Sequence, residues 1–283
     1  MRRFLLTLCL LAVGVQAFGQ GRVTTRKYRF SDFQDKIIKV VMSGNELIDS
    51  AIREDFVENW NLSPFEFCAE EDYQALRTNP DYYFFLVTEG RFKGEDVPGI
   101  RLLTLEKGGP DDPDSPTPHT EVVTLPLGPT GIGSGRELFF LPALLKAIRA
   151  YTVEALQSER VAYTADSWFN RDFSRARTMR IFLAETDLAE RVTDRDKSRY
   201  LDDDFLLMDE DDVDAAYANA TFNTLVSYSV APAVPVPGSS WCYTLLFNAE
   251  NGALMYLHKH KVTARNGAGF TAEDLRRIAR VRR

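Results

Sequence analysis

The chain repeats one pattern after an offset of 140 residues. Residues 65–87 lie over residues 205–227 without a gap, so that acids 70–72 meet acids 210–212 at the start of a helical pattern in each copy. Acidic residues favour a helix start because they face the positive end of the helix dipole. The repetition predicts an internal duplication of one α/β unit, although two unrelated β-α-β segments would also share this binary pattern.

The first copy has the order β-α-β-α-β-β. Strands are expected at 36–42, 64–68, 82–88 and 100–105, and the second helix at 70–77. The first helix follows the first strand directly, because Ser43 with Glu46 matches a capping box and Met42 with Leu47 a hydrophobic staple. Apolar residues then recur at helical spacing from Leu47 to Trp60, which predicts one face buried against the sheet.

The second copy should begin with a strand at 179–183 and a more charged helix at 186–200. After the overlaid segment come two strands, 241–248 and 254–262, around Asn251-Gly252, which is a strong hairpin signal. Thr271 and Asp274 then repeat the capping pattern, and Phe270 and Leu275 the staple, of a shorter closing helix.

Three further segments connect or interrupt the copies. Residues 108–119 are rich in Pro and Asp and predict an exposed loop, and residues 231–240, with three prolines, predict a loop inside the second copy. A long helix is expected at 142–158, with Pro142 in its first turn and a wide apolar face packed on the first sheet. The predicted fold is therefore α/β (α+β), with two similar tandem β-α-β-α-β-β subdomains of mixed sheets, residues 21–160 and 161–283.

The first twenty residues match a secretory signal peptide. Arg2 and Arg3 precede an apolar run, 4–15, which ends in small residues around Ala17. The run is shorter than the roughly 20 apolar residues that a membrane-spanning helix needs. We expect an exported protein, periplasmic or extracellular, without a transmembrane segment or lipid anchor in the mature chain.

Charge and cysteines limit the partners. The net charge of −7 falls to −9 when Arg2 and Arg3 leave with the leader, which argues against nucleic acid because binding it requires neutralised phosphates. Cys9 leaves too, so Cys68 and Cys242 remain. They can form one disulfide only if their Cα atoms lie within about 7 Å, which the sequence leaves open.

His258 and His260 are the candidates for metal ligands. Two residues apart in a strand, they share one face, and a regular hairpin places that face with Trp241, Tyr243 and other apolar residues. Structural histidines at the rim of an aromatic face are the favoured interpretation. A metal site or a catalytic role is the alternative, and a metal site would need a third ligand from a carboxylate not visible in the pattern.

Other motifs fail the templates they suggest. Cys242 falls on the opposite hairpin face, where Lys259 and Lys261 could lower the pKa of its thiol. A cysteine hydrolase also needs a histidine beside the thiol, and the alternation of side chains places both nearby histidines on the other face. The glycine-rich run 128–135 before the long helix lacks the lysine of a P-loop and the third glycine of a dinucleotide fingerprint. A flexible turn is favoured there, with anion binding at the helix start as the alternative.

Charged clusters have simple interpretations. The acids at 202–204 and 209–212 do not match an EF-hand, since Asp214 and Ala220 stand where Gly and Glu are needed, and Asp209 can cap a helix instead. Six arginines between Arg265 and Arg283 suit a helix carboxyl end, or else dock on an anionic partner. The sequence therefore predicts no catalytic residue and no cofactor.

The element order, the leader and the closing hairpin resemble a periplasmic α/β module, as in the curli-secretion channel lipoproteins and the amino-terminal domain of the Tol-system propeller protein. The resemblance covers residues 36–105 and 179–262 and rests on order and hydrophobic pattern. The chain has no lipobox cysteine and no propeller repeats, so neither pore formation nor Tol function is implied. The resemblance implies a non-enzymatic envelope module that works by contact.

We therefore expect an exported binding or assembly module that contacts an envelope protein or a small ligand between its two halves, because pockets favour such interfaces. One alternative is a hydrolase of envelope polymers that uses scattered carboxylates and leaves no linear motif. The other is a metal-binding protein that uses His258 and His260. Two carboxyls with opposed pKa shifts in a cleft would favour the enzyme, and an exposed apolar patch would favour the binding module.

Overall fold

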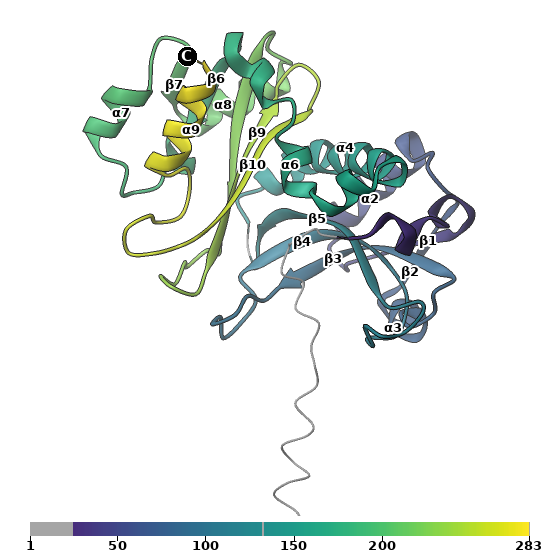
Figure 1. Ribbon diagram of the computed structural model, residues 1–283. Coiled ribbons are helices and arrows are strands. Elements are labelled where there is room, and N and C mark those ends of the chain that lie inside the picture. The colour runs from purple at the N-terminus through teal and green to yellow at the C-terminus, as the bar shows by residue number, and fades with distance from the viewer. Residues whose placement is uncertain (1–24, 132, 283) are drawn as a thin grey trace, which may run out of the picture.

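Two five-stranded mixed sheets form the frame of the protein. The computed structural model describes residues 25–131 and 133–282, so the expected leader lies outside the described residues. The first sheet contains β1 (Ile37–Val41), β2 (Phe65–Cys68), β3 (Tyr82–Gly90), β4 (Ile100–Lys107) and β5 (Thr120–Pro129). The second contains β6 (Arg180–Ala184), β7 (Phe205–Met208), β8 (Thr224–Val230), β9 (Trp241–Asn248) and β10 (Leu254–Lys261). Figure 1 shows the first sheet in blue and the second in green and yellow.

The two sheets have the same topology. The first runs β2-β1-β3-β4-β5, and the second, read from the other edge, runs β7-β6-β8-β9-β10. In each sheet the first strand of the half is parallel to both its neighbours, and the last two pairings are antiparallel. The α/β fold with two similar halves is confirmed.

The structure adds a fifth strand to the first half. The sequence pattern does not predict β5, because Pro126, Gly128 and Pro129 are typical turn residues. It lies at the edge of its sheet, where a missing N–H can face away from the ladder, so prolines are tolerated. Each half is therefore β-α-β-α-β-β-β followed by a closing helix.

The predicted gap-free alignment of the two copies fails after their acidic helices, where the true offset is two residues larger. Helix α3 (Glu70–Leu76) has seven residues and α8 (Glu210–Ala218) has nine. Tyr82 pairs with the first strand as Thr224 does, so Thr224 and not Phe222 is its equivalent. A shift of two preserves which side chains face the core, which is why the hydrophobic patterns of the two copies still match.

The helix that follows the first strand begins later and differently than predicted. Helix α2 (Glu46–Asn59) is capped by the Asn45 side chain, which accepts from the N–H groups of Leu47 and Ile48, while Ser43 binds Asp49 instead. The staple is also wrong, because Leu47 is 67% exposed. In the second half only a short 3-10 turn, η4 (Glu185–Asp187), and helix α7 (Asp194–Tyr200) occupy the expected helical segment.

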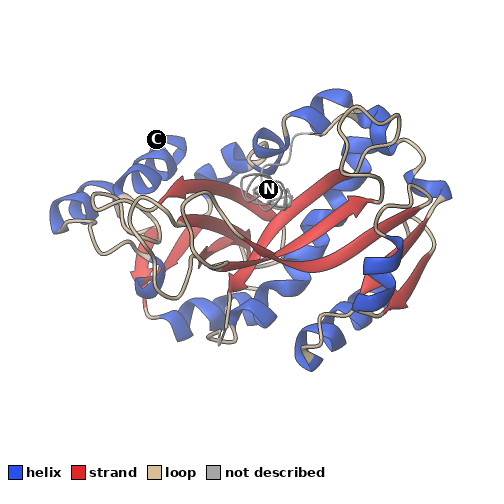
Figure 2. Cartoon of the chain, turned by 90° about the horizontal axis from the view of Figure 1, so that it is seen from below, coloured by secondary structure: helices blue, strands red, loops and turns tan. Residues whose placement is uncertain are grey.

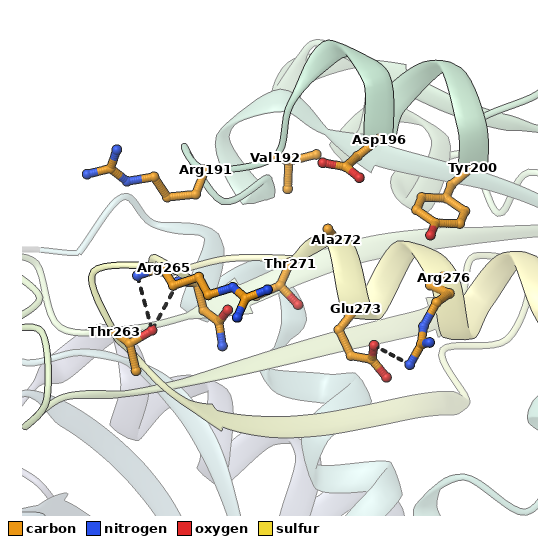
Figure 3. Close-up of a pocket in the computed structure, with 11 residues that line it drawn as sticks. Arg191, Val192, Asp196, Tyr200, Thr263, Arg265, Thr271, Ala272, Glu273 and Arg276 are labelled. Carbon is orange, nitrogen blue, oxygen red and sulfur yellow. Dashed lines mark hydrogen bonds and ion pairs between the residues drawn. The ribbon is translucent and has the colours of Figure 1, made fainter.

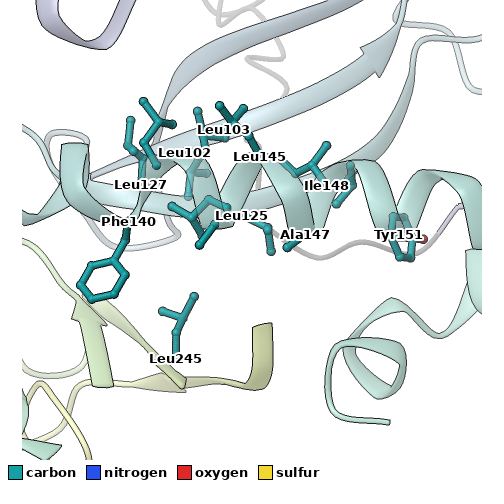
Figure 4. Packing of buried hydrophobic residues seen from close by; sticks show 14 of the residues in the cluster. Leu102, Leu103, Leu125, Leu127, Phe140, Leu145, Ala147, Ile148, Tyr151 and Leu245 are labelled. Atoms are coloured by element: carbon teal, nitrogen blue, oxygen red, sulfur yellow. The ribbon is translucent and has the colours of Figure 1, made fainter. Parts of the chain in front are cut away.

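Helix α4 (Arg136–Gln157) lies between the two sheets. It begins six residues before the predicted start, so Pro142 is inside the helix and not in its first turn. The prediction that it packs on the first sheet is confirmed by the packing of Leu145 and Ile148 against that sheet, and its Phe140 turns to the second sheet near Leu245 (Figure 4). One apolar cluster therefore runs through both halves.

The two halves contact each other through faces that are not equivalent. The first half presents α4, which packs beside α2, to the face of the second sheet that also carries α8, and the buried side chains of all three helices belong to the same cluster. The opposite face of the second sheet is covered by α9 (Ala272–Arg282) and the 3-10 helix η3 (Phe173–Thr178), over a second cluster. Small helices fill the remaining edges: η1 (Lys27–Phe30), η2 (Phe33–Asp35), α5 (Glu159–Tyr163) and α6 (Ala165–Phe169). Figure 2 shows helices on both sides of the strands.

Candidate functional site

A cavity of about 260 Å³ lies on the seam between the two halves. We call it the seam pocket. The first half contributes Pro129, Ser134 and Arg136, and the second half contributes the other lining residues. Asp187, Glu210 and Ser229, which line it, follow or end the parallel strands β6, β7 and β8. Ligands of open α/β sheets bind at such carboxyl ends, where the connections leave in opposite directions.

Arg136, the first residue of α4, organises this pocket. Its guanidinium donates to Asp214 at 2.9 Å and to Asp187 at 3.1 Å, and lies 3.4 Å from a Glu210 oxygen. It also donates to the backbone oxygen of Ser227. Both Arg136 and Asp187 are buried, at 7% and 2% exposure. Three carboxylates from the second half therefore hold one cation from the first.

Asp187 is fixed on its other side by β8. Its oxygens accept from the Ser227 hydroxyl at 2.6 Å and from the Ser229 N–H at 2.9 Å. Burial raises the pKa of Asp214, while the hydrogen bond and charge of Arg136 act in the opposite direction. Because all three carboxylates bind the same guanidinium, they balance a charge in the seam and are poorly placed to exchange protons with a substrate.

The glycine-rich run before α4 encloses a carboxylate of the chain itself. Glu137 accepts from the N–H of Gly135 at 3.0 Å and from Arg101 at 3.0 Å. A Cβ at Gly133 would lie 1.8 Å from a Glu137 oxygen, so only glycine allows this approach. The position at the helix start where an anion would bind is therefore filled by Glu137.

Two loops from different halves meet beside the seam pocket. Residues 91–99 connect β3 to β4, and residues 231–240 connect β8 to β9 as predicted. A Cβ at Gly99 would lie 2.6 Å from Pro232, and one at Gly94 3.1 Å from Ser239, so the loops are in contact. Their exposed apolar side chains are Val97, Val234 and Val236, at 71%, 81% and 53% exposure. We call these three valines the valine rim.

A larger cavity, about 630 Å³, lies within the second half, between α7 and the start of α9 (Figure 3). Arg191, Arg265 and Arg276 line it. Arg276 pairs with Glu273, whereas the guanidiniums of Arg191 and Arg265 have no acidic partner among the described residues. Asp196 and Glu273 also line the cavity, so its three guanidiniums face two carboxylates.

The predicted pairing of the hairpin strands holds for the first pair after the turn and is wrong from there on. The turn at Asn251-Gly252 forms as expected, and Leu254 pairs with Phe247, but a bulge at Met255 shifts the later pairs by one position. His258 therefore lies opposite Thr244, and His260 opposite Cys242. The histidines therefore lie on the face covered by α9, where His258 contacts Asp274, and not on the face of Trp241 and Tyr243.

The opposite face of the hairpin carries the lysines. The ammonium of Lys259 lies 4.5 Å from the ring centre of Phe92, 4.8 Å from that of Trp241 and 5.2 Å from that of Tyr243. These distances are typical of cation–π contacts. The bulge therefore exchanges the positions that a regular hairpin would give to the histidines and the lysines.

His258 and His260 form a cluster with Asp274, the carboxylate that the sequence pattern could not show. One ligand atom from each of the three residues lies within 4.8 Å of the others. His258 Nδ1 lies 2.6 Å from Asp274, which also accepts from the Tyr256 hydroxyl. The predicted capping box with Thr271 is confirmed, since its N–H and hydroxyl donate to Asp274. His119 is elsewhere, 3.1 Å from Glu106.

Cys242 and Cys68 are free thiols in different sheets. Contrary to the prediction, Cys242 and the histidines share one face of the hairpin, because Cys242 pairs with His260 across the two strands. The lysines do not activate it either, since burial raises the pKa of Cys242 to about 12. Its sulfur accepts from the N–H of Gly269.

The remaining charged clusters serve local structure. The acids 210–212 occupy the first turn of α8, but the Asp209 side chain makes no cap hydrogen bond. At the carboxyl end, the Arg282 side chain is largely buried, binds the Met179 backbone oxygen and lies within 3.5 Å of Asp202 and Asp204. No helix among the described residues is long and apolar enough to span a bilayer.

Comparison with known proteins gives no relative: no family, no curated protein and no solved structure matches the chain.

Proposed function

We propose that the protein is an exported binding or assembly module of the cell envelope, and that it holds a partner protein across the seam between its halves. The observation that carries the proposal is the valine rim, three exposed apolar side chains on two loops that contact each other, one from each half, beside the seam pocket. Exposed apolar side chains on neighbouring loops favour a contact surface. The expected leader and the resemblance to periplasmic modules are the reasons to seek the partner in the envelope.

The seam pocket suits one polar side chain of such a partner. Its lining combines hydroxyls of Ser134, Thr186 and Ser229 with carboxylates and small apolar residues. A partner that buries the three valines would therefore also place a hydrogen-bonding group over the pocket. Interfaces of this kind combine an apolar centre with a few directed polar contacts.

Capture from the native envelope tests the proposal. The tagged full chain is compared with a Val234→Asp/Val236→Asp variant and with a Val57→Asp control, since Val57 is 68% exposed on α2 away from both loops. We expect the wild type and the control to retain the same defined envelope protein, and the rim variant to lose it. Retention by the rim variant at wild-type yield would exclude the rim as the contact surface.

The carboxylates of the seam pocket give little support to the alternative, a polymer hydrolase. Asp187, Glu210 and Asp214 all bind Arg136, so none is held free beside a substrate. Turnover of wall or glycan substrates by the wild type, with no retained partner, would favour the hydrolase and contradict the binding module.

A further inference from the structure

His260 has one ring nitrogen that is committed and one that is not. Nε2 lies 3.3 Å from the backbone oxygen of Gly267, and because a carbonyl only accepts, this nitrogen must donate. The neutral ring then carries its lone pair on Nδ1. This atom is buried and has no hydrogen-bond partner among the described residues. A buried acceptor without a donor is costly, so the lone pair calls for an electrophile.

The surroundings of His260 supply the other ligands. The ring of His258 lies 5.7 Å from that of His260, centre to centre, at 27°. Asp274 adds a fully buried carboxylate; burial alone would raise its pKa, but hydrogen bonds from His258 and Thr271 lower the pKa to about 2. Burial also lowers the pKa of His260. The cluster therefore brings two imidazoles and one carboxylate together.

We propose that His258, His260 and Asp274 bind a divalent transition metal ion of the Zn²⁺ class. Two imidazoles and one carboxylate are a ligand set that Zn²⁺ accepts in proteins, with a fourth position left open. The three ligand atoms lie within 4.8 Å of one another. Ligand atoms about 2.1 Å from one tetrahedral ion are roughly 3.4 Å apart, so the ion would draw the widest pair together and replace the hydrogen bond between His258 and Asp274.

The second layer of contacts has the form that such sites need. A metal-binding histidine usually donates its other N–H to a backbone carbonyl or a carboxylate, which fixes the ring. His260 does so with Gly267. Tyr256 donates to the Asp274 oxygen that His258 also contacts, and Thr271 donates to the other oxygen. The Cys242 thiol stays protonated through burial, which raises its pKa, and is not one of the proposed ligands.

Zinc titration of the purified full chain tests the proposal. The protein is stripped with a chelator and titrated with Zn²⁺ by calorimetry, with Mg²⁺ in parallel. We expect one Zn²⁺ per chain, no response to Mg²⁺, and a rise in Tm with Zn²⁺ because the ion binds the folded state. A His258→Gln/His260→Gln variant should lose both effects, while His119→Gln, which removes the only other histidine, should retain them.

A second measurement needs no variant. Diethylpyrocarbonate modification of the wild type, read by mass spectrometry, should be slowed by Zn²⁺ at His258 and His260 and unchanged at His119. Absence of stoichiometric zinc, or zinc that binds equally well to the double variant, would overturn the proposal. If the double variant fails to fold in chelator, the wild type still decides the question, because protection of His119 alone, or of no histidine, would overturn the proposal as well.

Discussion

Arg136 is the residue that balances the charge of the seam. Removing it leaves Asp187 buried with an uncompensated charge. We expect Arg136→Ala to lower the free energy of unfolding by about 3–5 kcal/mol, the usual cost of breaking a buried pair. Urea denaturation measures this loss. Arg175→Ala is the matched control, because its pair with Asp172 is 78% exposed on the arginine side and should change stability by less than about 0.5 kcal/mol.

His119 makes stability depend on pH near neutrality. Burial alone would lower its pKa, but the hydrogen bond and charge of Glu106 outweigh it and raise the pKa above the ordinary 6.5. A histidine with a raised pKa stabilises the fold at pH below 6.5, and this contribution is lost as pH rises through the folded value. We expect His119→Gln to remove that decline. An unchanged slope of unfolding free energy between about pH 6 and 8 would contradict the assignment.

At the scale of elements, closing helices are fastened in the same way in both halves. In the first half Glu137, in the first turn of α4, binds Arg101 on β4. In the second half Asp274, in the first turn of α9, binds His258 on β10. Each acid also accepts a backbone N–H at its own helix start. In each half an acid in the first turn of the closing helix therefore binds a basic side chain of the antiparallel strands, on β4 in one half and on β10 in the other.

The contact in the second half can be tested by one substitution. Asp274→Asn removes the charge and turns one of the two acceptor oxygens, which serve His258, Tyr256 and Thr271, into a donor. We expect a loss of about 2–4 kcal/mol in the free energy of unfolding. Because the pKa of Asp274 is lowered from 3.8 to about 2, its contribution is complete above pH 3.8 and falls away towards pH 2. The variant should have a flatter acid limb in a pH series of denaturation curves. Glu273→Gln should flatten it less, because the lowered pKa of Glu273 comes from pairs with Arg276 and Arg277 that are exposed to solvent.

Sequence reasoning predicts most elements because their signals are local. The acidic starts of α3 and α8, the Asn251-Gly252 turn and the Thr271–Asp274 box all act over a few residues. The bulge at Met255 depends on pairing with β9, and β5 depends on lying at a sheet edge, so neither has a local signal. The histidine cluster escapes prediction for this reason, since one shifted residue exchanges the two faces of a strand.

At the scale of the molecule, Phe140 joins the two halves. Its ring stacks on Tyr228 at 4.7 Å and on Phe247 at 5.3 Å, both in the second sheet. We expect Phe140→Ala to cost about 3–5 kcal/mol, because a fully buried aromatic side chain leaves a cavity. Phe222→Ala, at a position 75% exposed, serves as the control and should cost less than about 0.5 kcal/mol. Equal losses for the two variants would contradict the packing.

The shared core also predicts one unfolding transition. Trp60 lies in the first half and Trp241 in the second, and a single apolar cluster includes or contacts both. Single-tryptophan variants that keep one or the other should therefore report the same urea midpoint by fluorescence. Separate midpoints would show that the halves unfold independently. The sequence indicates two copies but not their shared core, because tertiary packing decides which faces of α4 contact each sheet.

The two fastenings of the closing helices differ in one chemical respect. A guanidinium keeps its proton at every pH that a folded protein meets, whereas an imidazole does not. The tie through Arg101 is therefore constant. Imidazole nitrogens also bind metal ions, so an ion held by His258 would replace its hydrogen bond to Asp274. The two closing helices are therefore held by a permanent charge in one half and by a side chain that can exchange its partner for an ion in the other.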